Sequence, residues 1–418
     1  MKCHVGGVFN KLKKYCENEN YKGWDPYDGL NSSFFQALPF KKWDLARLVW
    51  IQFFKRSPIN FRKLFGVPKA HNAKGIALFL SGYCNLYTIS KLKNTAYGSS
   101  EALLKKINEL AHLLLNLKNT NYSGACWGYN FDWQARRLFF FPKNTPTVVA
   151  TSFAVDALLM AYSITKNKVY LKACISATKF VLNDLNRTVY KCGFLFSYAP
   201  LKGNNTVYNA SLLGAKILSQ VYAYTKNESL KITAKKTISA CCDAQNKNGS
   251  WVYGMLPVQS WIDSFHTGYN LEAIQTYIDC TGDFTFQKNI NVGLNFYLKS
   301  FFKTDGTPKY YYNKTYPIDI HCPGQLFVTI SKLNVFSLHA VLAKQVVQWT
   351  IKNMQDKRGY FYYQLKQGVS SKISYMRWSN AFMFNALSYY LLEQENKQSI
   401  NISSLKRYNY FTGRLTKK

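Results

Sequence analysis

Acidic residues are scarce in this chain of 418 residues: 21 Asp and Glu stand against 54 Lys and Arg, which gives a formal net charge of +33 at pH 7. Such a balance can indicate a partner that carries negative charge, such as an acidic or phosphate-bearing substrate. The lysines are spread over helix faces and do not form one run, so we favour a composition set by an AT-rich genome as their explanation. No nucleic-acid-binding module is recognisable, which argues against a nucleic-acid partner.

Cysteine pairs at metal-ligand spacing are also absent. None of the ten cysteines forms a CxxC pair, and Cys84, Cys174 and Cys280 lie in apolar stretches. This pattern is typical of free thiols in a reducing compartment, and we expect no metal and no cofactor.

The N-terminus has no apolar signal core, and the longest apolar stretch, 75–89, is interrupted by Asn85 and too short to cross a bilayer. We therefore expect a cytoplasmic protein without a transmembrane segment.

A repeated turn is the main positive feature of the sequence. Gly249-Ser-Trp251 follows a polar helix and precedes an apolar one, and aromatic turns of the same kind begin at Gly124, Gly193, Gly306 and Gly359. These turns lie about 50 to 70 residues apart, which is the length of one helical hairpin with its loop. The repeat therefore indicates an architecture built from hairpins.

The helices between the turns alternate in polarity. Helices that are apolar almost all round are expected near 71–90, 148–163, 206–224, 265–280, 321–333 and 376–394. Helices with a polar face are expected near 43–55, 98–117, 167–184, 228–245, 285–302 and 335–354. Since an all-apolar helix is buried and a striped one lies at the surface, this predicts an all-α (α/α)6 toroid of inner and outer helices. We assign residues 43–395 to this single domain, with an unassigned N-terminal extension at 1–42 and a basic tail at 396–418.

All inner helices of such a ring would begin at the same end, so the residues near their N-termini would converge on one mouth of the central cavity. Asp263 with His266, and Asp319 with His321, occupy the same position in consecutive repeats, and Asp132 lies in the long connection 119–147. We predict these five as acid–base candidates.

Aromatic faces and amide or guanidinium groups suit the C–H faces and hydroxyls of a sugar. The predicted substrate-binding residues are Trp127, Tyr129, Trp133, Arg136, Trp261, Asn270, Gln325, Arg377, Trp378 and Asn380.

Two reactions fit these candidates. A pair of carboxylates could cleave a glycosidic bond, or a His or Tyr could remove a proton beside a uronate carboxylate that Arg377 holds. Each candidate also has a structural explanation: the aspartates could be helix caps, the histidines could be satisfied core residues, and the turn aromatics could wedge between hairpins. A glycan-binding protein without catalysis is therefore the second hypothesis.

Several strings resemble a known family. Trp127-Gly-Tyr-Asn-Phe-Asp132, Trp261-Ile-Asp-Ser-Phe-His266, Ile318-Asp-Ile-His321 and Met376-Arg-Trp378 resemble motifs of six-hairpin, glycosidase-like proteins encoded in capsule, O-antigen and exopolysaccharide loci. The resemblance covers roughly 70–395 and implies a role in surface-polysaccharide biosynthesis, but it does not supply the reaction. Together with the candidate residues, it leads us to expect an enzyme that acts on a glycan, a nucleotide sugar or a lipid-linked sugar by hydrolase, epimerase or lyase chemistry. More remotely, the chain resembles glucuronyl C5-epimerases and N-acylglucosamine 2-epimerases.

A second resemblance is confined to the turns. Gln245-Asn-Lys-Asn-Gly249-Ser-Trp251 and, more loosely, Gln355-Asp-Lys-Arg-Gly359-Tyr360 resemble the QW repeats of triterpene cyclases. The sequence has neither a DxDD nor a DDxxD cluster, which argues against terpenoid chemistry.

Overall fold

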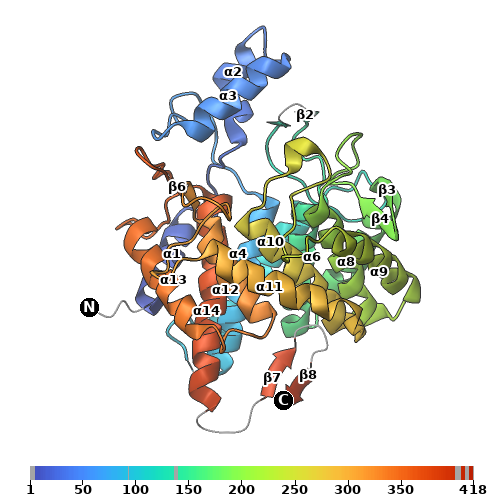
Figure 1. Cartoon of the computed structure of the whole chain (residues 1–418). Coiled ribbons are helices and arrows are strands. Elements are labelled where there is room, and N and C mark those ends of the chain that lie inside the picture. The colour runs from blue at the N-terminus through green and yellow to red at the C-terminus, as the bar shows by residue number, and fades with distance from the viewer. Residues whose placement is uncertain (1–4, 93, 136–139, 401–405, 410–413, 418) are drawn as a thin grey trace.

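The computed structural model describes residues 5–92, 94–135, 140–400, 406–409 and 414–417, and helices dominate it (Figure 1). The inner ring consists of α4 (Ala73–Lys91), α6 (Val148–Thr165), α8 (Tyr208–Thr225), α10 (Ser264–Thr281), α12 (His321–Lys332) and α14 (Phe382–Ile400). Each inner helix packs against the next along the chain, and α14 packs back against α4, so the ring is closed. Among the described helices, α6 is long and apolar enough to cross a membrane, and 78% of it is buried inside the protein.

The outer layer consists of α1 (Val5–Asn18), α5 (Ser100–Asn116), α7 (Lys168–Lys179), α9 (Glu228–Asp243), α11 (Gln287–Phe301) and α13 (Ala340–Met354). Each outer helix buries one stripe; α1, for example, buries Phe9, Leu12 and Cys16 and exposes its lysines or leaves them half-exposed. The (α/α)6 toroid predicted from the alternation of polarity is confirmed.

The structure differs from the expectation at the first outer helix. The helix near 43–55 exists as α3 (Asp44–Arg56), but it packs on η1 (Asp28–Asn31) and β1 and leaves Leu45 and Val49 exposed. The sixth outer position is filled by α1, which lies against α14. This helix belongs to the stretch 1–42 for which the sequence predicts no structure.

The glycine turns explain how the outer helices are joined. Gly249 has a φ of +92°, and a side chain there would overlap the carbonyl group of Val292 in α11. Gly359, with a φ of +104°, lies in the same way against the carbonyl group of Lys11 in α1. Each turn therefore rests on the outer helix of the next hairpin, and the last turn rests on α1.

The glutamines of the QW-like segments add hydrogen bonds at the same places. Gln355 Nε2 donates to the carbonyls of Gly359 at 3.0 Å and of Val8 at 3.2 Å. Gln245 Nε2 donates in the same way to the carbonyl of Gly249 and to α11, both at 3.0 Å. Their equivalent contacts identify α1 as the helix that closes the outer layer.

Gly359→Ala is expected to lower the free energy of unfolding by roughly 1–3 kcal/mol, because it forces a side chain into a left-handed backbone and against Lys11. Equilibrium denaturation measures this loss. Gly368→Ala is the matched control, since its φ is +95° but no described atom lies within 4 Å of the added Cβ. Equal losses in the two variants would show that the contact with α1 contributes nothing.

Short strands pair two by two in the described chain. The antiparallel pairs are β1 (Trp133–Gln134) with β2 (Phe140–Phe141), β3 (Arg187–Tyr190) with β4 (Gly193–Phe196), β5 (Ile318–Asp319) with β6 (Gln364–Leu365), and β7 (Lys406–Asn409) with β8 (Arg414–Lys417). The remaining short helices are η2 (Phe180–Asp184), η3 (Pro257–Gln259), η4 (Phe284–Phe286) and η5 (Met376–Ala381). The pair β5–β6 matters most for the site, because it places Gln364 opposite Asp319.

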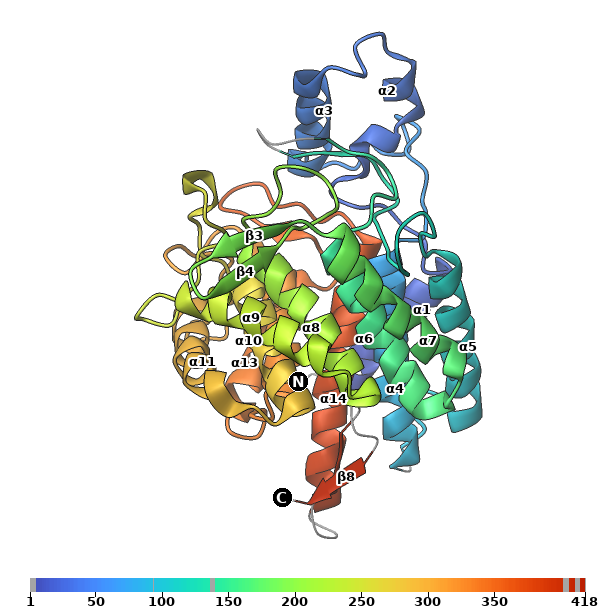
Figure 2. The same ribbon diagram turned by 90° about the vertical axis from the view of Figure 1, so that its right-hand side faces the viewer.

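Residues 24–68, which we call the N-terminal insertion, leave the ring between α1 and α4. They form η1, α2 (Ser33–Ala37) and α3 around a small core of Leu30, Phe35 and Ile51. The α2–α3 part stands beyond one end of the ring, and the β7–β8 hairpin lies at the opposite end (Figures 1 and 2). The inner helices begin at the end that the insertion covers, as its contacts with Trp378 and Arg377 at the start of the last inner helix show.

Candidate active site

The first turn of α10 carries an aspartate–histidine pair. Asp263 caps the helix, because its Oδ1 accepts a hydrogen bond from the His266 amide at 3.0 Å. Its Oδ2 lies 2.7 Å from His266 Nδ1 and accepts from Trp261 Nε1 at 2.9 Å. A carboxylate oxygen accepts, so this contact holds the Nδ1–H of His266 toward Asp263 and leaves Nε2 as the ring nitrogen that does not face the carboxylate. The His266 side chain is 20% exposed, so a ligand can reach it.

Asp319, immediately before α12, is the second buried carboxyl group. Its Oδ1 accepts from the His321 amide at 3.0 Å and from Trp378 Nε1 at 2.9 Å, and its Oδ2 accepts from Gln364 Nε2 at 3.1 Å. Burial raises the pKa of Asp319 to about 6, even though these three hydrogen bonds favour the charged form. The mouth therefore contains a carboxyl group that titrates close to neutral pH.

His321 is held as a neutral imidazole. The ring is buried between Phe382, at 3.4 Å between ring centroids, and Trp378, at 4.6 Å. Burial lowers its pKa well below 6.5, and the positive charges of Lys74 and Arg377 act in the same direction. The two histidines lie on the same aromatic residue: the ring of Phe265 is 4.2 Å from that of His266 and 4.8 Å from that of His321.

Lys74 joins this group although no motif predicts it. Its Nζ donates to the Tyr269 hydroxyl at 3.2 Å, and that hydroxyl lies 3.2 Å from His321 Nε2. Burial lowers the pKa of Lys74 well below 10.5, and the ammonium lies 4.1 Å from the centre of the Phe153 ring. The signal in the sequence was a lysine inside an otherwise apolar helix, two residues after the cap Asn72.

Buried polar atoms without partners gather at the starts of the inner helices. Of the thirteen such side-chain atoms in the described chain, seven lie there: Ser152 Oγ, Asn209 Oδ1, Ser264 Oγ, Asn270 Oδ1, His321 Nδ1, Ser379 Oγ and Asn385 Oδ1. They lie in the first two turns of five inner helices or in η5 before α14, and the other six lie elsewhere in the chain. Unsatisfied buried polar groups are costly, so their concentration at one end of the ring is typical of a site that binds a polar ligand.

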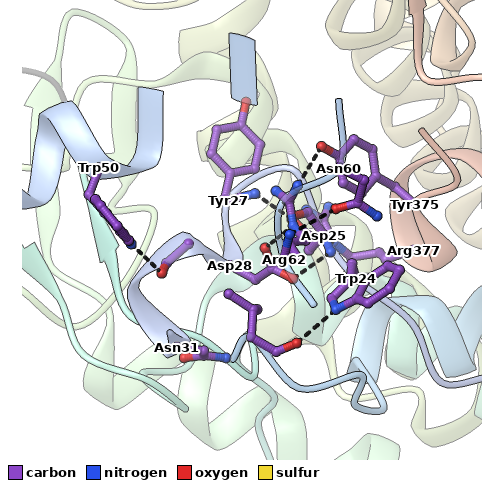
Figure 3. A network of polar contacts seen from close by, with 12 residues as sticks. Trp24, Asp25, Tyr27, Asp28, Asn31, Trp50, Asn60, Arg62, Tyr375 and Arg377 are labelled. Carbon is purple, nitrogen blue, oxygen red and sulfur yellow. Dashed lines mark hydrogen bonds and ion pairs between the residues drawn. The ribbon is translucent and has the colours of Figure 1, made fainter. Parts of the chain in front are cut away.

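Two buried arginines hold the N-terminal insertion over this mouth (Figure 3). Arg377 donates from Nε and Nη2 to the carboxylate of Asp25, at 2.6 and 2.8 Å. Arg62 donates to Asp28 Oδ1 at 2.7 Å and to the Tyr375 hydroxyl at 2.9 Å. The sequence predicts that Arg377 binds an anionic group of the substrate. In this structure its guanidinium binds an internal carboxylate instead, that of Asp25, 352 residues away in the chain.

The predicted aromatic platforms fall into two groups. Tyr129, Trp133 and Trp378 lie under the insertion: the Arg377 guanidinium is 5.0 Å from the Tyr129 ring, and Tyr27 lies 6.0 Å from Trp133 and 5.6 Å from Trp378. Trp127, in contrast, is fully buried and donates from Nε1 to the Leu114 carbonyl at 2.8 Å. A ring enclosed in this way cannot stack on a sugar, so Trp127 is a wedge between hairpins.

Three other predicted residues have structural partners. Asn380 is buried and accepts from the Phe361 amide at 3.0 Å, while Asp132 accepts from the Lys143 amide at 2.6 Å and stabilises a turn. Gln325 lies inside the ring and donates to Glu272. Arg136 is outside the described residues.

The rim beside His266 opens into a cleft of about 400 Å³. It is lined by Trp261, Tyr311, Tyr312, Asn313 and Lys314, among others. Trp261 stacks on Tyr253 at 4.4 Å, and the Tyr253 ring lies 4.7 Å from that of His266. The cleft therefore adjoins the Asp263–His266 pair and has the aromatic walls that a sugar ring requires.

A buried charged cluster lies about two helical turns below the mouth. Asp156 accepts from Lys216 Nζ at 2.8 Å, from Lys332 Nζ at 2.6 Å and from Gln220 Nε2 at 2.6 Å. Glu272 adds a carboxylate 3.7 Å from Lys332. These residues come from four consecutive inner helices, so the cluster links them across the ring. Among the described residues no group of His, Cys, Asp and Glu is arranged to hold a metal ion.

Comparisons with known proteins identify the fold. No family model and no curated protein sequence matches the chain. The chain is similar to cellobiose 2-epimerase from Bacillus thermoamylovorans, with a TM-score of 0.61 and 14% identity over 93% of this chain and 99% of that one. It is also similar to a glycoside hydrolase family 76 mannosidase from Bacteroides thetaiotaomicron, with a TM-score of 0.58 and 10% identity over 95% of this chain and 100% of that one. For unsaturated glucuronyl hydrolase from Streptococcus agalactiae, the TM-score is 0.55 at 11% identity, over 93% and 91% of the two chains. At such identities the likeness establishes the fold alone, and the chain has the six-hairpin toroid fold of these carbohydrate-active enzymes.

Proposed function

We propose that this protein is an enzyme that acts on a glycan or glycan precursor by proton transfer at the mouth of the ring. The observation that carries the proposal is the pair of histidines around Phe265. His266 is oriented as a base by Asp263, and His321 is a neutral imidazole connected to Lys74 through Tyr269. Two such groups can remove a proton from carbon and return one, which is what an epimerase needs, or assist an elimination, as in a lyase.

The carboxyl groups favour this chemistry over hydrolysis. A glycosidase uses two carboxyls that face the scissile bond, one as acid and the other as base or nucleophile. Here Asp263 and Asp319 each accept hydrogen bonds from internal groups of the protein on both oxygens. They therefore orient neighbouring side chains, and the partly exposed His266 is the group left to exchange protons with a substrate directly, with the buried His321 behind it.

Other features support a pathway and a compartment for the proposed enzyme. The motifs around Asp132, His266, His321 and Trp378 support a role in surface-polysaccharide biosynthesis through their resemblance to proteins of those loci. The described cysteines are free thiols, all but Cys192 buried, which supports a reducing compartment such as the cytoplasm. The net charge of +33 suits an acidic glycan or a sugar on a phosphate carrier.

His266→Ala is expected to lower turnover at least about 100-fold, because it removes the oriented base. The protein is incubated in D2O with reducing and uronate-containing oligosaccharides. Deuterium incorporation at carbon, measured by NMR, reports proton exchange, and new reducing ends report hydrolysis. His112→Ala is the matched control, since His112 lies exposed on the outer helix α5. A folded His266→Ala protein with full activity would contradict the assignment.

A glycan-binding protein without turnover is the alternative that one observation favours. In this structure the open cleft lies at the rim, whereas the space between Asp25, Gly75 and Arg377 under the insertion is only about 10 Å³, room for one water at most. Oligosaccharide binding that persists in a combined Asp263→Ala and Asp319→Ala variant, with no exchange or cleavage in the wild type, would support this alternative.

A further inference from the structure

The N-terminal insertion exposes an unusual amount of apolar surface. Trp43, Leu45, Val49, Ile59 and Leu64 have relative exposures of 69%, 72%, 59%, 61% and 76%. Apolar residues normally appear on a protein surface one at a time, whereas these five all lie within residues 43–64. An exposed cluster of this kind indicates a binding surface.

Three of the exposed side chains share one face of α3. Leu45, Val49 and Phe53 are spaced by four residues along α3 and form one stripe, while Ile51 and Phe54 of the same helix point into the protein. Phe53 stacks on Phe61, at 5.6 Å between ring centroids, which continues the stripe into the segment that carries Ile59 and Leu64. We call the set formed by Trp43, Leu45, Val49, Phe53, Ile59 and Leu64 the α3 surface.

Basic residues adjoin this surface in the chain. Lys41, Lys42, Lys55, Arg56 and Lys63 lie beside it in the chain, and Asp44 is the one acid between residues 29 and 68. Lys42, Arg56 and Lys63 are exposed. A helix with an apolar stripe, a tryptophan and a basic rim is typical of segments that lie in the interface of a lipid bilayer, where anionic headgroups attract the cations.

We propose that the α3 surface docks this protein on an anionic lipid bilayer. A second copy of the chain fits less well, because its own basic rim and net charge of +33 would oppose the contact. Negatively charged headgroups complement the rim, and the acyl region accepts the apolar side chains. The surface needs no rearrangement of the ring, since its side chains already point away from the protein.

The position of α3 gives the docking a consequence for the site. Lys55 Nζ donates to the Tyr27 hydroxyl at 2.8 Å, and the Tyr27 ring lies 5.6 Å from that of Trp378. The insertion stands beyond the mouth end of the ring (Figure 2). Docking through α3 would hold the mouth close to the headgroups, where a lipid-linked sugar is presented. This choice of substrate rests on the proposed function, whereas the docking itself does not.

Vesicle flotation of the full chain tests the docking. We expect it to float with vesicles of equal parts phosphatidylglycerol and phosphatidylcholine and to bind pure phosphatidylcholine more weakly. A Trp43→Ser/Leu45→Ser variant is expected to bind the anionic vesicles about tenfold more weakly or worse, because both side chains would enter the interface. Val189→Ser is the matched control, since Val189 is 86% exposed on β3, outside the α3 surface. Brominated lipid should quench tryptophan fluorescence in the wild type and quench it less in Trp43→Phe.

Three outcomes would overturn the proposal. One is the absence of flotation at low salt. Another is equal flotation of the wild type and the Trp43→Ser/Leu45→Ser variant, since it would mean that the +33 charge adsorbs without using this surface. The third is a wild type that self-associates without lipid while the double variant is monomeric, because the α3 surface would then join two copies. None of these results depends on the turnover assay, so docking and proposed function can fail separately.

Discussion

Asp156→Ala is expected to lower the free energy of unfolding by roughly 3–5 kcal/mol. The carboxylate lies between the ammonium groups of Lys216 and Lys332, at 2.8 and 2.6 Å, inside the ring. Burial alone would raise the pKa of Asp156, but the two lysines outweigh it and hold the pKa below its usual value. Removing the carboxylate leaves the buried Lys216 ammonium without its ion-pair partner and close to that of Lys332, which keeps only the more distant Glu272 at 3.7 Å.

Denaturant unfolding of the single and double variants measures this effect. Adding Lys216→Met to Asp156→Ala removes one of the stranded cations, so we expect the double variant to recover part of the loss. Glu109→Ala is the matched control for an exposed ion pair: its partner Lys106 is 31% and Glu109 itself 45% exposed, and its loss should stay below about 1 kcal/mol. An Asp156→Ala protein as stable as Glu109→Ala would show that the cluster does not hold the inner helices together.

Asp319→Asn is expected to make the protein more stable at neutral pH. The folded-state pKa of about 6 lies above the ordinary value of 3.8, so the folded protein binds this proton more tightly than the unfolded chain does. The resulting stabilisation is full below about pH 4 and is lost as the pH rises through about 6. Asparagine has no proton to lose. The stability of the variant relative to the wild type should therefore rise by about 3 kcal/mol between pH 3 and pH 7.5, two pKa units at about 1.4 kcal/mol each.

Unfolding measured against pH, as the difference between variant and wild type, tests the prediction, because the other titrating groups cancel. Asp356→Asn is a control with the opposite sign. Burial would raise the pKa of Asp356, but its hydrogen bonds to Arg358 lower it to about 2, so that its contribution is lost as the pH falls. A pH-independent difference for Asp319→Asn would contradict the raised pKa. If the variant is more stable yet less active, the carboxylate is retained for the site and not for the fold.

Local patterns in the sequence were sufficient to predict the ring and to single out candidate residues at one end of it. The alternation of all-apolar and striped helices predicts inner and outer layers, because burial follows from the polarity of each helix face. The turns at Gly249 and Gly359 set the period, since only a left-handed backbone fits there. Asp263, His266, Asp319 and His321 could be singled out because equivalent positions in the repeats meet at one end of a toroid.

The first hairpin and the insertion could not be predicted in the same way. Helices α1 and α3 are both amphipathic, and nothing local distinguishes the one that packs on the ring from the one that leaves an apolar stripe exposed. Which helix packs is decided by contacts with residues more than 300 positions away, such as those of Gln355 with α1.

The sequence by itself determined the fold class and the end of the ring where Asp263, His266, Asp319 and His321 lie. Only the tertiary structure decided that the carboxylate of Asp25 binds Arg377, that Lys74 is connected to His321 through the Tyr269 hydroxyl, and that the Trp127 side chain is fully buried. The physical reason is the distance along the chain over which each interaction acts. Helix periodicity and capping depend on neighbours within about four residues, whereas an ion pair or a pKa shift depends on which distant groups the closed ring brings into contact.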